Sequence, residues 1–467
     1  MEISVGRYLP HPGRGPAIRD VRLTAGPHGV AVTEGAPPDA DGRLAMPAPV
    51  NAHDHGYGIR TLDFGCPDDA LEPWIAGLRL RPPTDPYLEA LVAFGRLALN
   101  GCGATMHCHN SLRIDGLADE AAMVIRAARD CGIRLALSCP LLDTAPWTYA
   151  GADALRAHVG KDDWQAFEKR RPAYASIEEQ IAVVSDIVRT QSGPMVDVQF
   201  GPIGPQWCSD ALLEAIAETS RTLDCRIHMH LLETRRQRHW LDKRFPDGIV
   251  RYLDSIGFLS PRLAVAHGVH LTPGECELLA ERGVVVASNP AANLRLRSGV
   301  APVSAYRSAG LRFALGLDGT GFSDDQDIWQ EMRLLRLLQG GTSIDPAIQA
   351  GEIFDAATIN GAAVINQRTD GDLVVIDYGA MMSERMFDDV DEAEAILTRM
   401  SGRYVKDLVI SGKTVVADGR LTGFDFEAAL KELVGQARAS APEKQEERQF
   451  ARRLGEAVRR FYRDGGP

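Results

Sequence analysis

The sequence lacks the features that mark several other classes of protein. It has no run of about 18 apolar residues, so no membrane-spanning helix is expected. Its formal net charge is −12, which disfavours nucleic acid and anionic membrane as partners because both require a basic surface. The first residues, MEISVGRYLPHPGRG, contain no apolar segment typical of a signal peptide. We therefore expect a cytoplasmic protein that acts on a small molecule.

Paired cysteines and low-complexity segments are also missing. The eight cysteines are scattered and form no CxxC motif, which in a chain of this length indicates reduced thiols. Hydrophobic residues make up 45% and charged residues 24% of the chain, an ordinary globular composition. A chain of 467 residues can hold a large domain together with a smaller unit.

Short apolar runs alternate with amphipathic stretches over most of the chain. Together with MPAPVNA (46–52), which ends at His53, these runs give eight strand–helix repeats. Eight repeats of this kind predict an α/β fold, a closed (β/α)₈ TIM barrel. The other predicted strands are GATMHCHN (103–110), IRLALSCP (133–140), MVDVQFGPIG (195–204), CRIHMHLLE (225–233), LAVAHGVHL (263–271), VVVASNP (284–290) and LRFALGLDG (311–319).

The two ends of the chain have a different pattern, of short strands and turns. We expect residues 1–45 and 366–423 to pair into a small β-sandwich, and residues 46–365 to form the barrel. Residues 424–467 read as a charged helical tail, either solvated or packed on a neighbouring subunit. An insertion at 141–175, rich in Trp and Tyr, is expected to shape a pocket over the barrel mouth.

Four of the predicted strands end in residues that can bind a metal ion. In a strand, residues i and i+2 point to the same side, so His53 and His55 can reach one ion. Barrel enzymes keep their sites at this end of the strands, and imidazole with carboxylate suits zinc or a similar divalent ion. The strand ends carry His53 and His55, His228 and His230, His267, and Asp318.

The motifs NAHDH, HLLET, AHGVHL, ASNPAANLRLRSGVAPV and LGLDG resemble, in order and spacing, those of the amidohydrolase superfamily. The similarity spans about residues 46–330 and the terminal sandwich, and it lies with the single-metal branch of cytosine, guanine, adenosylhomocysteine and triazine deaminases and hydrolases. It implies a homo-oligomer in which the functional residues are the metal ligands His53, His55 and His230, the proton-shuttling acid Glu233, the water- or substrate-holding His267, and Asp318 as both ligand and base.

Two-metal relatives bridge their ions with a lysine on the fourth strand. Here that strand reads MVDVQFGPIG and has no lysine, so the resemblance implies one divalent ion. Zinc is expected, with Fe²⁺, Co²⁺ and Mn²⁺ as alternatives. His228 has no role in the family motif, and we expect it to be structural.

The sequence departs from the deaminase pattern at two strands. Many deaminases of this branch have APHAPYTCS where this chain has GPIGPQWCS, so a substrate-contacting histidine is replaced by Ile203. A His-Cys-Pro of the seventh strand is replaced by Ser288-Asn289-Pro290. Because lost polar groups weaken recognition of a hydrogen-bonding ring, Ile203 and Trp207 indicate an apolar pocket. Polar contacts to the substrate could instead come from His107, His109 and Asn289.

These departures favour hydrolysis of a urea, carbamate or amide with an apolar group, by a protein similar to the phenylurea and molinate hydrolases. One alternative is a deaminase of a heteroaromatic amine such as a purine, pterin or s-triazine. Another is an inactive barrel that serves as a binding subunit. We expect Arg295 and Arg297 to form salt bridges, and the acidic segment GTGFSDDQD (319–327) to contain the start of a helix.

Overall fold

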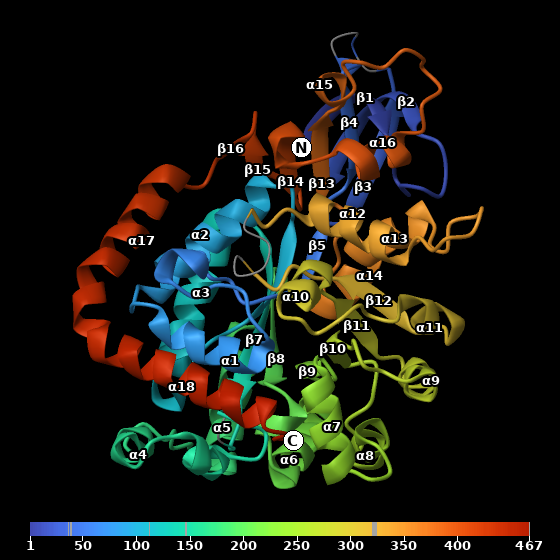
Figure 1. Cartoon of the computed structure of the whole chain (residues 1–467). Helices are drawn as coiled ribbons and strands as arrows, with labels where there is room; N and C mark the ends of the chain where they lie inside the picture. Colours follow the sequence, from blue (N-terminus) through green and yellow to red (C-terminus); the bar gives the residue numbers. More distant parts are fainter. Residues whose placement is uncertain (36, 38–39, 112, 145–146, 320–324, 467) are drawn as a thin grey trace.

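The computed structural model describes residues 1–466 except 36, 38–39, 112, 145–146 and 320–324. In this part of the chain the strands form two eight-stranded sheets, ordered β12-β11-β10-β9-β8-β7-β6-β5 and β16-β15-β14-β13-β4-β1-β2-β3 (Figure 1). The first sheet forms the barrel, and the second joins the two ends of the chain.

The barrel strands are parallel and follow one another in chain order. The barrel closes because the backbone N–H groups of Leu317 and Asp318 both donate to the carbonyl of His53, at 3.1 and 2.9 Å. The predicted (β/α)₈ barrel is therefore confirmed. Its strands are β5 (Val50–Asp54), β6 (Ala104–Cys108), β7 (Arg134–Leu141), β8 (Val196–Pro202), β9 (Ile227–Leu231), β10 (Leu263–His267), β11 (Val285–Ser288) and β12 (Arg312–Leu315).

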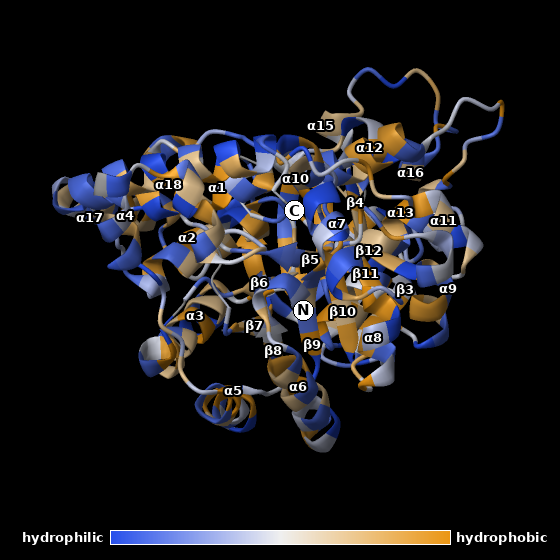
Figure 2. Cartoon of the chain, turned by 60° about the horizontal axis from the view of Figure 1, so that its bottom comes forward, coloured by the Kyte–Doolittle hydropathy of each residue, from blue (hydrophilic) through white to orange (hydrophobic). Residues whose placement is uncertain are grey.

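Amphipathic helices surround the barrel and carry both hydrophobic and hydrophilic residues (Figure 2). Several begin at a side chain that accepts a hydrogen bond from the first turn, such as Asp85, Ser176 and Ser209. The helices are α2 (Pro86–Leu99), α3 (Leu117–Cys131), α5 (Ile177–Gln191), α6 (Asp210–Leu223), α7 (Arg235–Arg244), α8 (Ile249–Ser255), α9 (Pro273–Glu281), α10 (Pro290–Arg295), α11 (Val303–Ser308), α12 (Ile328–Gln339), α13 (Ala350–Ala357) and α14 (Ile359–Ile365).

The second sheet confirms the predicted β unit from both termini. Strand β4 pairs in parallel with β1 and antiparallel with β13, so one continuous sheet holds both ends. Its own core includes Val5, Val21, Leu23 and Val375. Its strands are β1 (Glu2–Tyr8), β2 (Ile18–Gly26), β3 (Gly29–Glu34), β4 (Arg43–Pro47), β13 (Leu373–Asp377), β14 (Val405–Ile410), β15 (Lys413–Ala417) and β16 (Arg420–Leu421), with α15 (Tyr378–Met381) and α16 (Glu392–Arg399) between β13 and β14.

The C-terminal tail packs on its own chain, so the expectation of a solvated tail is wrong. It forms α17 (Phe426–Ser440) and α18 (Gln445–Arg463), and α18 packs against α1 (Leu71–Gly77) and the insertion after β7 of the same chain (Figure 1). In α18 the buried residues recur every three or four positions. That apolar stripe needs a covering surface, and the insertion, with α4 (Lys161–Glu168), supplies it.

All eight cysteines are free and buried, as the scattered spacing predicts. Within the described ranges, no helix has the length and apolar content needed to cross a membrane.

Candidate active site

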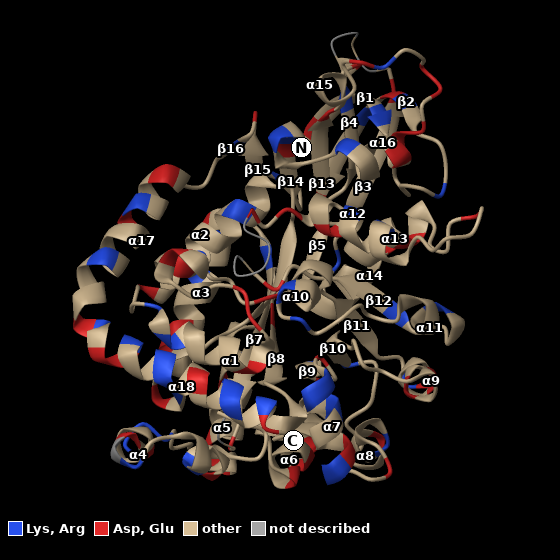
Figure 3. Ribbon diagram, viewed as in Figure 1, with Lys and Arg blue, Asp and Glu red and all other residues tan. Residues whose placement is uncertain are grey.

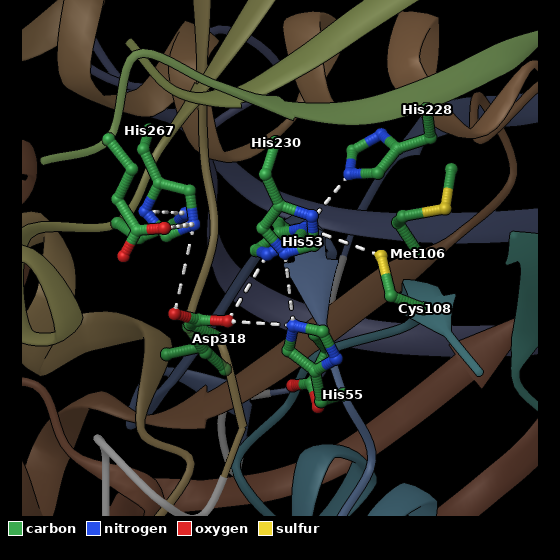
Figure 4. A network of polar contacts seen from close by, with 12 residues as sticks. His53, His55, Met106, Cys108, His228, His230, His267 and Asp318 are labelled. Carbon is green, nitrogen blue, oxygen red and sulfur yellow. Dashed lines mark hydrogen bonds and ion pairs between the residues drawn. The ribbon is translucent and has the colours of Figure 1, made fainter. Parts of the chain in front are cut away.

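Three histidines and one aspartate converge at the carboxyl ends of β5 and β9 and just beyond β12 (Figure 4). Asp318 Oδ1 lies 3.1 Å from His53 Nε2 and 3.3 Å from His55 Nε2. His55 Nε2 lies 3.2 Å from His230 Nε2. Bonds of about 2.0–2.1 Å to a tetrahedral ion require donor atoms to be roughly 3.3 Å apart. These three separations suit donor atoms that share one metal ion.

The hydrogen bonds of the rings leave lone pairs that suit a cation. His55 Nδ1 lies 3.0 Å from Asn110 Oδ1, and His230 Nδ1 lies 2.7 Å from the carbonyl oxygen of Ile203. Both oxygens are acceptors, so each ring donates from Nδ1 and keeps a lone pair on Nε2. Two lone pairs that face each other repel unless a cation lies between them. His53 Nε2 and Asp318 Oδ1 are likewise buried without a hydrogen-bond partner in the described part of the chain. These residues therefore fit a divalent ion.

Burial favours the neutral form of the three candidate ligand histidines. It lowers the pKa of His53 and His230 well below 6.5, and the neighbouring imidazoles add to the effect. The pKa of His55 is lowered by burial as well. Neutral imidazole is the form that binds a metal ion, so the site is in its binding form at neutral pH.

His228 holds the ring of His53 from behind. Its Nε2 lies 2.8 Å from His53 Nδ1, and burial lowers its pKa to about 3. Cys108 Sγ lies 3.5 Å from the same Nδ1, and burial raises the pKa of this thiol well above its usual value. His53, Cys108 and His228 could in principle form a second set of metal ligands. A protonated thiol is a poor ligand, so this set does not compete with the set that contains Asp318. Sequence reasoning gave His228 a structural role, and its place behind His53 agrees with that.

Next to the ligand atoms lie two groups suited to proton transfer. His267 Nε2 lies 3.8 Å from Glu233 Oε2 and 4.0 Å from Asp318 Oδ2. His267 Nδ1 bonds to Asn293 Oδ1 at 2.9 Å, which leaves Nε2 directed toward the two carboxyl groups. Burial, and then the charges of Asp318 and Glu72, raise the pKa of Glu233 well above 4.5. Glu233 can therefore hold a proton near neutral pH.

These groups lie at a cavity of about 340 Å³ with a largely apolar wall. Ile203, Trp207 and His109 line it, as the sequence analysis expected of substrate contacts. His107 instead lines a neighbouring cavity of about 320 Å³, and Asn289 is fully buried with its Nδ2 3.3 Å from His267 Nδ1. The positions of His107 and Asn289 thus do not support direct contact with a substrate.

Residues 44–415 match the model of the Amidohydrolase family. The chain belongs to the amidohydrolase family. It is therefore a metal-dependent hydrolase that acts on carbon–nitrogen bonds.

Related proteins place this amidohydrolase in the single-metal branch. It is 27% identical to a 5′-deoxyadenosine deaminase of Methanosarcina mazei, over 84% of this chain and 86% of that protein. It is 29% identical to a 5-methylthioadenosine/S-adenosylhomocysteine deaminase of Nitratidesulfovibrio vulgaris, over 92% and 91% of the two chains. These deaminases favour the alternative function of the sequence analysis over the urea hydrolase.

Solved structures share the fold of this amidohydrolase. An adenosine deaminase of Xanthomonas campestris with bound zinc superposes with a TM-score of 0.77 at 22% identity, covering 95% of this chain and 98% of that one. A zinc complex of atrazine chlorohydrolase from Arthrobacter aurescens has a TM-score of 0.76 at 20% identity, covering 93% and 99%. At these identities the similarity supports the barrel architecture alone.

The backbone of the amidohydrolase is strained at two of its site residues. His267 has φ 73° and Asp318 has φ 61°, values that are rare outside glycine. Such strain is typical of functional sites that the surrounding structure holds in place. Close packing also fixes the end of β12: a Cβ on Gly316 would lie 2.2 Å from Asn289 Oδ1 and 2.8 Å from His53 Cβ.

Sequence reasoning missed the polar residues that hold the amidohydrolase ligands. Asn110 orients His55, Asn293 orients His267, and Ser298 Oγ lies 3.4 Å from Glu233 Oε1. Asn110 follows β6 at the same end of the barrel, so the strand-end rule applied to polar amides could have found it. Asn293 lies in α10 and Ser298 in the loop that follows it, where no such rule applies.

The remaining charged candidates have structural roles. Arg295 pairs with Asp68 at 2.7 Å and Arg297 with Asp69 at 3.5 Å, which confirms the expected salt bridges. Part of the acidic segment, residues 320–324, lies outside the described residues. Asp327 caps α12 by accepting hydrogen bonds from two backbone N–H groups of its first turn.

Proposed function

We propose that this amidohydrolase is a mononuclear zinc aminohydrolase that removes ammonia from a ring carbon of a heteroaromatic amine with an apolar substituent. The observation that carries the proposal is the convergence of His55, His230 and Asp318 donor atoms beside Glu233, a buried carboxyl group whose pKa is raised by burial. With His53 the donor set is three imidazole nitrogens and one carboxylate oxygen, a combination that favours zinc. The purine-nucleoside deaminases among its relatives support deamination.

The residues divide the chemistry between them. A zinc ion held by His53, His55, His230 and Asp318 would lower the pKa of a water molecule and polarise the target carbon. Asp318 Oδ2 accepts the proton that this water loses as its oxygen bonds to the ring carbon. His267 Nε2, near both carboxyl groups, carries a lone pair that accepts a hydrogen bond from the attacking water and so orients it.

Glu233 completes the reaction by giving its proton to the departing nitrogen. The carbon–nitrogen bond then breaks, and the nitrogen leaves as ammonia rather than as an unstable anion. The proton taken up by Asp318 returns to Glu233 through His267 or solvent, so water is the only reagent consumed. Because His55, His230 and Asp318 line one cavity together with Glu233, the inactive-barrel alternative is disfavoured.

One observation favours a second candidate, hydrolysis of an N-aryl urea or carbamate. Ile203 stands where the resembled deaminases have a histidine, and Trp147 and Trp207 line the same cavity. An apolar wall offers few hydrogen bonds to a purine ring, but it can bury an aryl group. The same catalytic groups would then release a substituted amine instead of ammonia.

A substrate screen separates the two candidates. We expect ammonia release from amino-heterocycles such as methylthioadenosine, aminopterins and amino-s-triazines, measured with a coupled assay on zinc-loaded enzyme. Phenylureas, carbamates and anilides are tested in parallel for amine release by chromatography. Release of aniline from phenylureas, with no ammonia from any heterocycle, would establish the second candidate and refute the first.

A further inference from the structure

The C-terminal helix α18 contributes to the wall of the active-site cavity. Leu454 and Val458 line the cavity, although they lie far beyond the last barrel strand in the sequence, which ends at Leu315. Each of the two side chains is 1% exposed, so they are packed and not free in solvent. Next to them in the wall lie Trp147 of the insertion after β7 and Ala76 of α1, which belong to the same apolar cluster.

Polar contacts hold α18 in this place. Glu447 bonds to Arg79 at 3.2 Å and to Arg170 at 3.0 Å. Near the other end of the helix, the hydroxyl of Tyr462 accepts a hydrogen bond of 3.1 Å from the backbone N–H of Tyr149. Figure 3 shows charges of both signs along the outer side of α18. The buried cluster and these contacts fix the position of the two lining side chains.

The part of the wall that contains Leu454 and Val458 differs in chemistry from the metal site. The cluster around them is aliphatic and aromatic, and none of the metal ligands, Glu233 or His267 belongs to it. A substrate that presents its reacting carbon to Asp318 therefore has an apolar surface available for the rest of the molecule.

We propose that Leu454 and Val458 set the size of the apolar substituent that the enzyme accepts, so that the C-terminal helix is its specificity element. This inference rests on the proposed function for the reacting end of the substrate. It concerns how the unreactive, apolar end of the substrate fits the cavity. Each methylene that gains or loses its place in a hydrophobic pocket changes discrimination by about 10–200-fold.

Binding of a homologous series tests the inference without turnover. The probes are 4-alkylanilines from methyl to hexyl, and affinity is measured by titration calorimetry on the zinc-loaded enzyme. Wild type is expected to bind more tightly as the chain lengthens and then to lose affinity beyond one length. In Leu454→Ala this optimum moves to a longer chain, with a gain of at least tenfold for the longest probe.

Matched variants separate a pocket effect from general damage. Leu454→Phe should move the optimum to a shorter chain. Leu279→Ala removes the same atoms from an equally buried position in α9 that does not line the cavity, and should leave the profile unchanged. Glu456→Ala, on the exposed side of α18, should also leave it unchanged.

The outcomes distinguish this inference from the proposed reaction. The inference is overturned if Leu454→Phe and Val458→Ala are folded and their affinities depend on alkyl chain length as in wild type. It is also overturned if the affinity of wild type does not depend on chain length. If the profile shifts as expected but no amino-heterocycle releases ammonia, only the proposed deamination fails.

Discussion

Replacing Glu233 by glutamine is expected to lower kcat by a factor of about 10²–10⁴ while leaving the bound metal in place. The amide cannot give a proton to the departing nitrogen, whereas the carboxyl group, with its raised pKa, can. Glu233 is not among the converging ligand atoms, so metal content should stay at the wild-type level. The measurements are steady-state kinetics on the substrate found in the screen and elemental analysis of the purified variant.

Glu331→Gln is the matched control for this variant. Glu331 is 1% exposed, and burial raises its pKa to about 8, so glutamine resembles the form present near neutral pH. It does not line the cavity, and its Oε2 accepts a hydrogen bond from the backbone N–H of Ala291 that an amide oxygen can also accept. Wild-type turnover in Glu233→Gln would assign the proton donor to another group.

Replacing Asp318 by asparagine is expected to have a still larger effect, because the residue has two functions. The amide lacks the charge that binds the ion and the basic oxygen that accepts the proton from water. We expect kcat to fall by at least about 10³-fold and metal affinity to fall by at least about tenfold. Kinetics with added zinc distinguish the two losses, since zinc can restore occupancy but not the base.

Asp327→Asn serves as the control for this second variant. Asp327 caps α12 close to Asp318 in the sequence, and asparagine is an equally good cap, so activity should be unchanged. If excess zinc returned Asp318→Asn to wild-type kcat, Asp318 would be a ligand only, and the base would have to be sought elsewhere.

The barrel and the convergence of its candidate metal ligands could be predicted from the sequence for one physical reason. Parallel strands all end at one rim of a barrel, so residues at strand ends meet in space whatever their distance in the chain. This rule brought His53, His230 and Asp318 together before any coordinates. The alternation of strand and helix, which fixes the fold, depends on local hydrophobic periodicity that a single sequence displays.

The cavity wall depends on contacts that no local pattern encodes. The stripe of α18 shows that the helix packs on something, but the same stripe fits the surface of another subunit as well as α1. In the same way, the position of His107 on β6 shows which face of the strand it lies on. It does not show which of the two cavities that face borders. The apolar wall could not be predicted for this reason, since its residues come from distant segments of the chain.

The proposed chemistry depends on a single ion bound where the histidine and aspartate donors converge. The most direct measurement is a crystal structure of the zinc-loaded enzyme with anomalous diffraction recorded at the zinc edge. We predict one anomalous peak about 2.0–2.2 Å from Nε2 of His53, His55 and His230 and from an Asp318 oxygen. Crystals of fully active enzyme with no peak at that position would contradict the account.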